Sequence, residues 1–274
     1  MNVVFNFLLI EGRFGFPPLG VEGAAVATAI GNVVGFCMAV FSVTQRSSEL
    51  RIWSKKGWRF EKRTIRGFVN VGGSSLVEQL IMRFGFLMFI KVVASLGTFA
   101  LSTHQICMNI VMLSFSFSDG LGVAASALIG QSLGAGRPDM AIIHGKVCQR
   151  IALTFSFILS FVFVFGRRLL VSLFTKDVDI INFGSNIVLI IAVLAFAQMS
   201  QVVISGSLRG AGDAKYVAIV SLFTAGMLRP GAAYLLAMPF GLIGVWIAFL
   251  LDQATRLLFN YTRFSTGKWV HVKL

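Results

Sequence analysis

Long runs of apolar residues, separated by short polar connections, dominate the hydrophobic pattern of this chain. A helix that crosses a bilayer needs about 20 predominantly apolar residues. Seven stretches are long enough, whereas an eighth, at residues 1–10, covers only about half of a span. The pattern predicts an all-α, polytopic membrane protein with spans at 21–44, 67–94, 104–133, 141–165, 180–205, 214–236 and 242–262.

Composition points to the same class. Of the 274 residues, 56% are hydrophobic and 13% are charged, whereas a soluble domain carries about 25% charged residues. A water-soluble core of this length cannot bury so much apolar surface. The sequence also shows no metal-ligand spacing, no phosphate-binding glycine loop and no nucleophile–base triad, so we expect neither a metal site nor an enzyme activity.

The formal net charge of +13 would suit a nucleic-acid-binding protein, but the distribution of the 24 Lys and Arg residues does not. Eight of them lie within residues 46–66, and most of the others mark the ends of apolar runs. The two alternating sets of connections hold sixteen and four basic residues. Cytoplasmic loops of membrane proteins carry such an excess. We therefore expect 46–66 to face the cytoplasm, and we expect no nucleic-acid partner.

One phrase occurs twice, as "PPLGVEGAAVA" at 17–27 and as "PFGLIGVWIA" at 239–248. The alignment matches Pro18, Gly20, Gly23 and Ala27 with Pro239, Gly241, Gly244 and Ala248. Both copies precede an apolar stretch on the same predicted side of the membrane, which indicates two parallel repeats related by an axis along the membrane normal. If the repeat holds, about 155 residues are missing from the first half.

Five phrases carry a resemblance to a known family: "GFPPLGVEGAAVAT" (15–28), "LGTFALSTHQI" (96–106), "AASALIGQSLGAGRPDMA" (124–141), "GSLRGAGDAKY" (206–216) and "FSTGKW" (264–269). They resemble the multidrug and toxic compound extrusion (MATE) family over almost the whole chain. The last phrase, together with Arg256 and Arg263, is most similar to the DNA-damage-inducible (DinF-like) branch.

The resemblance implies two six-helix bundles in a V around a central cavity, of which this chain holds the carboxyl-terminal portion. Residues 1–45 would be the end of the fifth helix and the sixth helix, and 46–66 a basic cytoplasmic linker. Residues 67–264 would form the complete second six-helix bundle, followed by a cytoplasmic tail at 265–274. The 274 residues alone are expected to be a non-functional fragment, because half of a V cannot alternate access.

The resemblance also implies the activity and its setting. We expect a secondary antiporter that exports small amphipathic or cationic compounds, driven by H⁺ or Na⁺ and without another cofactor. The expected location is the bacterial plasma (inner) membrane, where the protein would contact membrane lipids as a monomer. A lipid-linked oligosaccharide flippase, which can share this helix plan, is the alternative and should show a wide cationic cavity. The "GQSLGAG" and "LRGAGD" phrases favour the antiporter.

Charged residues inside the spans are the first candidates for chemistry, because each costs about 2.5–3.5 kcal/mol on insertion scales. We expect Glu78 to bind a proton or a cation; a structural ion pair to another helix is the alternative. Arg83 is a further candidate contact for an ion or substrate, with a position at the membrane interface as the alternative. Asp119 would be a cavity carboxylate or the partner of a neighbouring helix.

Gln198 and Gln201 fall on one face of their helix and could contact substrate or hydrogen-bond another helix. Some family members have an aspartate near Gln198, but a glutamine cannot exchange a proton. The resemblance therefore shifts ion coupling toward the missing half, where an aspartate in the first helix is expected. Asp252 and Arg256, four residues apart, are expected to form a structural ion pair.

Other residues receive more local interpretations. Arg229 and the proline after it predict a kink. Arg209 is placed in a short cytoplasmic loop. His104 is either pH-sensitive or, more simply, a capping or interface residue. A few aromatic side chains could line a cavity for aromatic cations, such as Phe84, Phe115 and Phe117.

Overall fold

The computed structural model describes residues 2–10, 12, 18–44, 62–267 and 269, and the regular elements in these ranges are helices. This confirms the predicted all-helical class. The chain divides into two compact units, Met1–Glu61 and Lys62–Leu274. Most of the predicted linker at 46–66 lies outside the described residues, so the predicted domain boundaries stay predictions.

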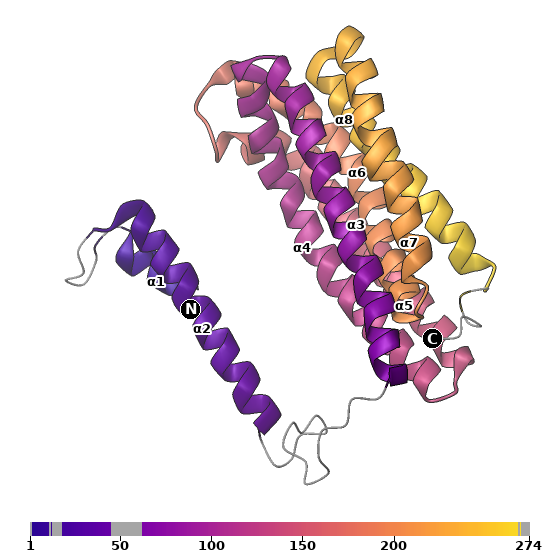
Figure 1. Cartoon of the computed structure of the whole chain (residues 1–274). Coiled ribbons are helices and arrows are strands. Elements are labelled where there is room, and N and C mark those ends of the chain that lie inside the picture. Colours follow the sequence, from indigo (N-terminus) through magenta and orange to yellow (C-terminus); the bar gives the residue numbers. More distant parts are fainter. Residues whose placement is uncertain (1, 11, 13–17, 45–61, 268, 270–274) are drawn as a thin grey trace. The chain divides into compact units, whose positions relative to one another are not determined.

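The first unit contains a short helix, α1 (Asn2–Leu9), packed against a long one, α2 (Gly20–Thr44) (Figure 1). The two helices run antiparallel. At the turn, the backbone N–H of Leu19 donates to the carbonyl of Leu9 at 3.0 Å. At the other end, the Asn2 amide donates to the Thr28 hydroxyl at 3.3 Å.

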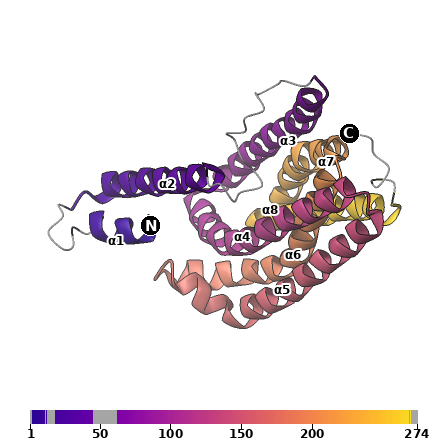
Figure 2. The same ribbon diagram turned by 90° about the horizontal axis from the view of Figure 1, so that it is seen from below.

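The second unit is a bundle of long helices joined by short connections (Figures 1 and 2). Helix α6 packs against α4, α5 and α8, whereas α3 packs mainly against the α7, η2 and α8 segments. The elements are α3 (Lys62–Ser95), α4 (Thr98–Gly134), α5 (Pro138–Ser172), α6 (Val178–Gly210), α7 (Ala214–Ser221), η2 (Leu222–Leu228) and α8 (Arg229–Ser265).

Five of the described helical segments are long and apolar enough to cross a membrane, namely Gly20–Ser42, Thr98–Gly134, Pro138–Ser172, Val178–Gly210 and Ala214–Ser265. The last is 52 residues long and contains two of the predicted spans. Helix α3 is not among the five, and its apolar part carries Glu78, Arg83 and Lys91. The sequence thus predicted the long helices, several of which extend beyond the predicted apolar stretches.

A sharp bend at Gly241 separates the two spans that α8 joins. The backbone of Gly241 has φ 56° and ψ −136°, which is not helical, and it follows Pro239 closely. A residue with a Cβ atom rarely adopts this conformation, so glycine suits the position. The bend lets the helical arm before Gly241 and the arm after it serve as separate spans.

A π-helix, η2, interrupts the span before this bend. Its last residue, Leu228, is two positions before Pro230, which has no N–H to donate to the preceding turn. The predicted kink at Arg229 is therefore realised as a wide turn just before this residue. Such π segments are frequent at functional sites.

Helices α4 and α6 cross at a point where their backbones touch. A Cβ atom added to Gly206 of α6 would collide with the backbone carbonyl of Gly122 in α4, and one added to Gly210 would collide with the carbonyl of Ser126. These small residues recur every four positions on both helices, as in membrane helix pairs that pack closely. The sequence therefore fixes the distance between α4 and α6.

His104 lies in the core of the bundle. It is fully buried, and its ring centroid lies 5.6 Å from that of Phe89 and 5.4 Å from that of Trp246. Among the described residues, neither ring nitrogen has a hydrogen-bond partner. Since the N-cap of α4 is Gly97, the prediction of a capping histidine is wrong; His104 instead lies between Phe89 of α3 and Trp246 of α8.

Candidate functional site

A buried carboxylate–guanidinium pair joins α3 to the end of α6. Glu78 is 4% exposed. Arg209 donates to its carboxylate twice, from Nη2 to Oε1 at 2.8 Å and from Nε to Oε2 at 3.2 Å. The hydroxyl of Ser221 in α7 donates to Oε1 at 3.1 Å. The side chain of Arg209 is 34% exposed, so the carboxylate of the pair is buried and the guanidinium is accessible to solvent.

A second buried carboxylate, Asp252 of α8, holds two arginines. Arg256 donates from Nη2 to Oδ1 at 3.0 Å, and Arg229 donates from Nε to Oδ2 at 2.8 Å and from Nη2 to the same oxygen. All three side chains are buried. Arg256 also donates to the Thr224 hydroxyl at 3.1 Å. The cluster of Asp252, Arg229 and Arg256 carries one net positive charge.

The cluster is stabilised by more than its one carboxylate. The Arg229 guanidinium lies 4.6 Å from the centre of the Phe249 ring, a distance at which a cation is attracted to an aromatic face. Arg256 Nη1 lies 3.3 Å from the sulfur of Met82 in α3. Each arginine of the cluster therefore contacts a polarisable side chain as well as the carboxylate.

A cavity of about 250 Å³ lies between α3, α4 and α8. Its wall is mostly aromatic and thioether, with two guanidinium groups: it is lined by Gln79, Met82, Arg83, Phe86, Met108, Met112, Phe115, Arg229 and Phe249. Methionine side chains adapt to irregular ligands, and aromatic rings attract flat ones. The cavity suits an amphipathic molecule with an aromatic part.

Only some of the residues singled out as candidates from the sequence line this cavity. Arg83 lines it and is exposed; in the described part of the chain it forms no ion pair within 4 Å. Phe115 also lines the cavity, whereas Phe84 and Phe117 do not and are exposed. Glu78 does not line it, although Gln79 and Met82 beside it on α3 do.

Asp119 is exposed on α4, and the positive charge of Arg209 acts on its carboxylate. Arg209 therefore interacts with two acidic residues, directly with Glu78 and at longer range with Asp119. The described residues contain no group of three or more His, Cys, Asp and Glu that could hold a metal ion. The in-span acids face guanidinium groups instead.

Gln198 and Gln201 are buried in α6 and do not line this cavity. The Gln198 amide donates to the Ser118 hydroxyl of α4 at 2.9 Å. The Gln201 amide donates to Ser205 at 3.0 Å, and Asn260 of α8 donates to the same hydroxyl at 2.8 Å. Their contacts are thus hydrogen bonds that join α4, α6 and α8.

Two arginines of the site were missed by the sequence interpretation. Arg209 was placed in a loop, but α6 continues to Gly210 and puts it in the last helical turn. Arg229 was interpreted as a kink marker, although it is 3% exposed and paired. One signal could have found both: a carboxylate within a span needs a cation, and Arg229 lies within a predicted span whereas Arg209 closely follows one.

Comparison with known sequences places this arrangement among transporters. The MatE family profile matches residues 75–235. The chain is 31% identical over 275 residues to an uncharacterized transporter, YisQ, of Bacillus subtilis, covering 98% of this chain and 60% of that protein. It is 29% identical to a probable multidrug resistance protein NorM of Thermotoga maritima, of which it covers 58%. The chain thus spans about 60% of the length of these relatives.

Solved structures give the same fold. A crystal structure of MATE in the straight conformation superposes with a TM-score of 0.85 at 20% identity, covering 97% of this chain and 60% of that one. The eukaryotic MATE transporter AtDTX14 superposes with a TM-score of 0.83 at 20% identity, covering 98% of this chain and 60% of that one.

Proposed function

Because this chain belongs to the MatE family of membrane transporters, we propose that it supplies the second six-helix bundle of a secondary antiporter. The proposed activity is export of small amphipathic or cationic compounds, driven by inward H⁺ or Na⁺. Relatives named as multidrug resistance proteins, such as NorM of Thermotoga maritima, support a drug-like substrate. Since the family consists of transporters, the expectation that the chain is not an enzyme is confirmed.

We further propose that the complete transporter has a first bundle of similar size, to which residues 1–45 belong. The duplicated "PPLG" and "PFGL" phrases and the 60% coverage of YisQ support this. The bacterial relatives support a location in the plasma (inner) membrane. Monomeric state and membership of the DinF-like branch are part of the same proposal, the latter supported by the "FSTGKW" phrase.

The observation that carries the proposal is the Glu78–Arg209 pair. Glu78 loses its negative charge when it takes up a proton, and it can also exchange Arg209 for a bound cation. In either case Arg209 is released, and Asp119, on which its charge already acts, is a second acid that it can pair with. One guanidinium with two acidic partners thus gives two arrangements that ion binding can select. Arg209 joins α3 to α6, so the choice changes how these two helices are linked.

The 250 Å³ cavity is the proposed contact surface for substrate on this half. Pockets for drug-sized ligands have volumes of about 300–1,000 Å³, so the cavity accommodates part of such a ligand, and the other half of the transporter would cover the rest. Met108, Met112 and Phe115 offer apolar contact to the flat part of a substrate, and Gln79 offers a hydrogen bond.

One observation favours the flippase as a second candidate. Arg83 and Arg229 both line the cavity, and no carboxylate is among the residues that line it in the described part of the chain. Asp252 balances only one of the two charges of Arg229 and Arg256, so this cluster and Arg83 together would attract an anionic group such as a lipid diphosphate. The antiporter remains the leading proposal because the named relatives are multidrug resistance proteins.

The test compares two carboxylate variants of the complete transporter in inverted membrane vesicles. Glu78→Gln should abolish the cation dependence of ethidium uptake, because the amide neither binds a proton nor holds Arg209 by charge. Asp139→Asn is the control, since its side chain is 63% exposed at the start of α5. Unchanged uptake and unchanged cation dependence in Glu78→Gln would remove Glu78 from the mechanism. Uptake of a polyprenyl diphosphate in place of ethidium would favour the flippase.

A further inference from the structure

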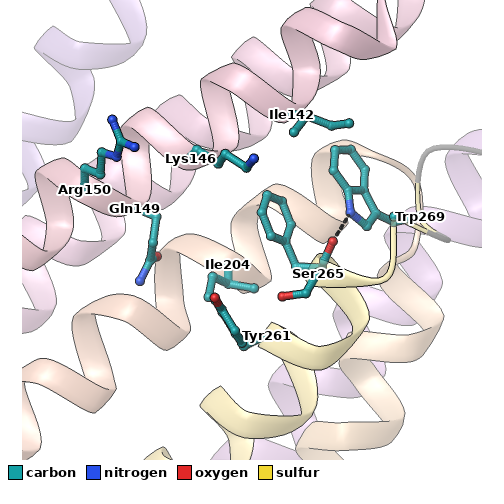
Figure 3. A pocket seen from close by; sticks show the side chains of 10 residues that line it. Ile142, Lys146, Gln149, Arg150, Ile204, Tyr261, Ser265 and Trp269 are labelled. Carbon is teal, nitrogen blue, oxygen red and sulfur yellow. Dashed lines mark hydrogen bonds between the residues drawn. The ribbon is translucent and has the colours of Figure 1, made fainter.

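A second set of cavities forms a groove between α5 and α8, built from residues that the transport proposal does not use. A cavity of about 620 Å³ lies at the end of the bundle where α5 begins and α8 ends (Figure 3). Another, of about 380 Å³, extends from it along the two helices. Gln149 and Tyr261 line both, so the two cavities are parts of one groove.

The outer part of the groove is cationic. Lys146 and Arg150 lie one helical turn apart on α5, and both line the larger cavity (Figure 3). Both are exposed, and neither forms an ion pair within 4 Å among the residues that the structure describes. The opposite wall is formed by the rings of Phe264 and Trp269, stacked with centroids 5.1 Å apart. Two uncompensated cations thus face the mouth of the groove.

The inner part is apolar. Leu153 of α5 and Leu257 and Leu258 of α8 line it. Leu258 is 61% exposed. From Ser265 at the mouth to Ala254 at the inner end, the groove follows α8 for about 16 Å at 1.5 Å per residue. This is close to half of the ~30 Å hydrocarbon thickness of a bilayer. The whole groove is therefore about as long as one leaflet, and its apolar part, from Tyr261 to Ala254, accounts for about 10 Å of this length.

We propose that this groove binds one anionic phospholipid from the leaflet at that end of the bundle. The phosphate lies against Lys146 and Arg150, and one acyl chain lies along Leu153 and Leu258. Basic pockets between membrane helices bind anionic lipid headgroups in this way. Gln149 lies where the two parts meet, and its side-chain oxygen has no hydrogen-bond partner within the described chain. It can accept a hydrogen bond from the glycerol hydroxyl of phosphatidylglycerol.

This assignment is independent of the transport proposal, because none of the groove residues belongs to the Glu78 or Asp252 sites. It places a lipid across α5 and α8, two helices that both pack on α6 but are not consecutive in sequence. A bound lipid would therefore hold the outer surfaces of the two helices at a fixed spacing.

The test uses the full 274-residue chain, purified in detergent with equal amounts of phosphatidylglycerol and phosphatidylcholine of identical acyl chains. Native mass spectrometry counts the lipids that remain bound. The wild type should retain phosphatidylglycerol preferentially, and Lys146→Ala/Arg150→Ala should weaken this retention at least about tenfold, given the usual contribution of basic residues near a lipid surface. Equal retention by wild type and this variant would overturn the proposal.

Two further variants separate a lipid site from general electrostatics and from a simple phosphate site. Arg167→Ala/Lys176→Ala removes the same charge near the other end of α5, where Lys176 follows the helix, and should leave retention unchanged. An equal loss would show that charge alone attracts the lipid. Ala254→Trp fills the apolar part and should also lower retention. If it does not, while Lys146→Ala/Arg150→Ala does, the groove recognises only a phosphate group and the acyl-chain assignment is wrong.

Discussion

Replacing Asp252 by Asn should destabilise the bundle more than any other single change in its charged cluster. The Arg256–Asp252 contact of 3.0 Å corresponds to an attraction of about 5 kcal/mol at an effective dielectric constant of about 20, and Arg229 adds a second contact of similar length. Asparagine has almost the same shape but leaves two buried guanidinium groups without a counter-charge. Removing one partner of a buried ion pair costs about 3–5 kcal/mol.

Thermal unfolding of the purified chain in detergent, followed by tryptophan fluorescence, measures this loss. With about 2–4 °C per kcal/mol for a domain of 150–250 residues, the midpoint should fall by roughly 6–20 °C. Arg256→Met is the matched comparison: it removes a charge from the same cluster but leaves the neutral Asp252–Arg229 pair, so its midpoint should fall less. A midpoint of Asp252→Asn equal to that of the wild type, or above that of Arg256→Met, would refute the reasoning.

Two further predictions concern glycines of the bundle and use the same unfolding midpoint. Gly206→Leu should lower the midpoint strongly, because a side chain there would push α6 away from Gly122 of α4. Gly231→Leu is the control and should be tolerated, because no atom lies within 4 Å of the added Cβ. Equal shifts of the two midpoints would show that the backbone contact does not matter. Gly241→Val should cost about 1–3 kcal/mol because valine strongly disfavours the φ of 56° at the bend; an unchanged midpoint would mean that the chain turns there without strain.

The long helices could be predicted because bilayer thickness sets a minimum apolar length, which the sequence shows directly. The bend at Gly241 falls between the predicted spans 214–236 and 242–262, where "PFG" interrupts the apolar pattern. The π-helix at Leu222–Leu228 was not predicted. Its residues are as apolar as those of an ordinary span, and hydrogen-bond register leaves no mark on the hydrophobic pattern.

The candidate site was predictable only in part, for a similar reason. Glu78 and Asp252 were identifiable because an acid inside an apolar run is unusual. Arg256 followed from helical periodicity, being four residues from Asp252. Arg209, however, is 131 positions from Glu78, and Arg229 is 23 positions from Asp252. Such pairings depend on how helices pack, which periodicity within one helix does not report.

The contact between α4 and α6 has a mechanical consequence. Where the main chains touch at Gly122 and Gly206, the contact is made by backbone atoms, which cannot change rotamer to let one helix slide past the other. We therefore expect the two helices to move as one rigid body when the transporter changes conformation. Bending must then occur elsewhere, and we expect it at the wide turn of η2, beside Arg229.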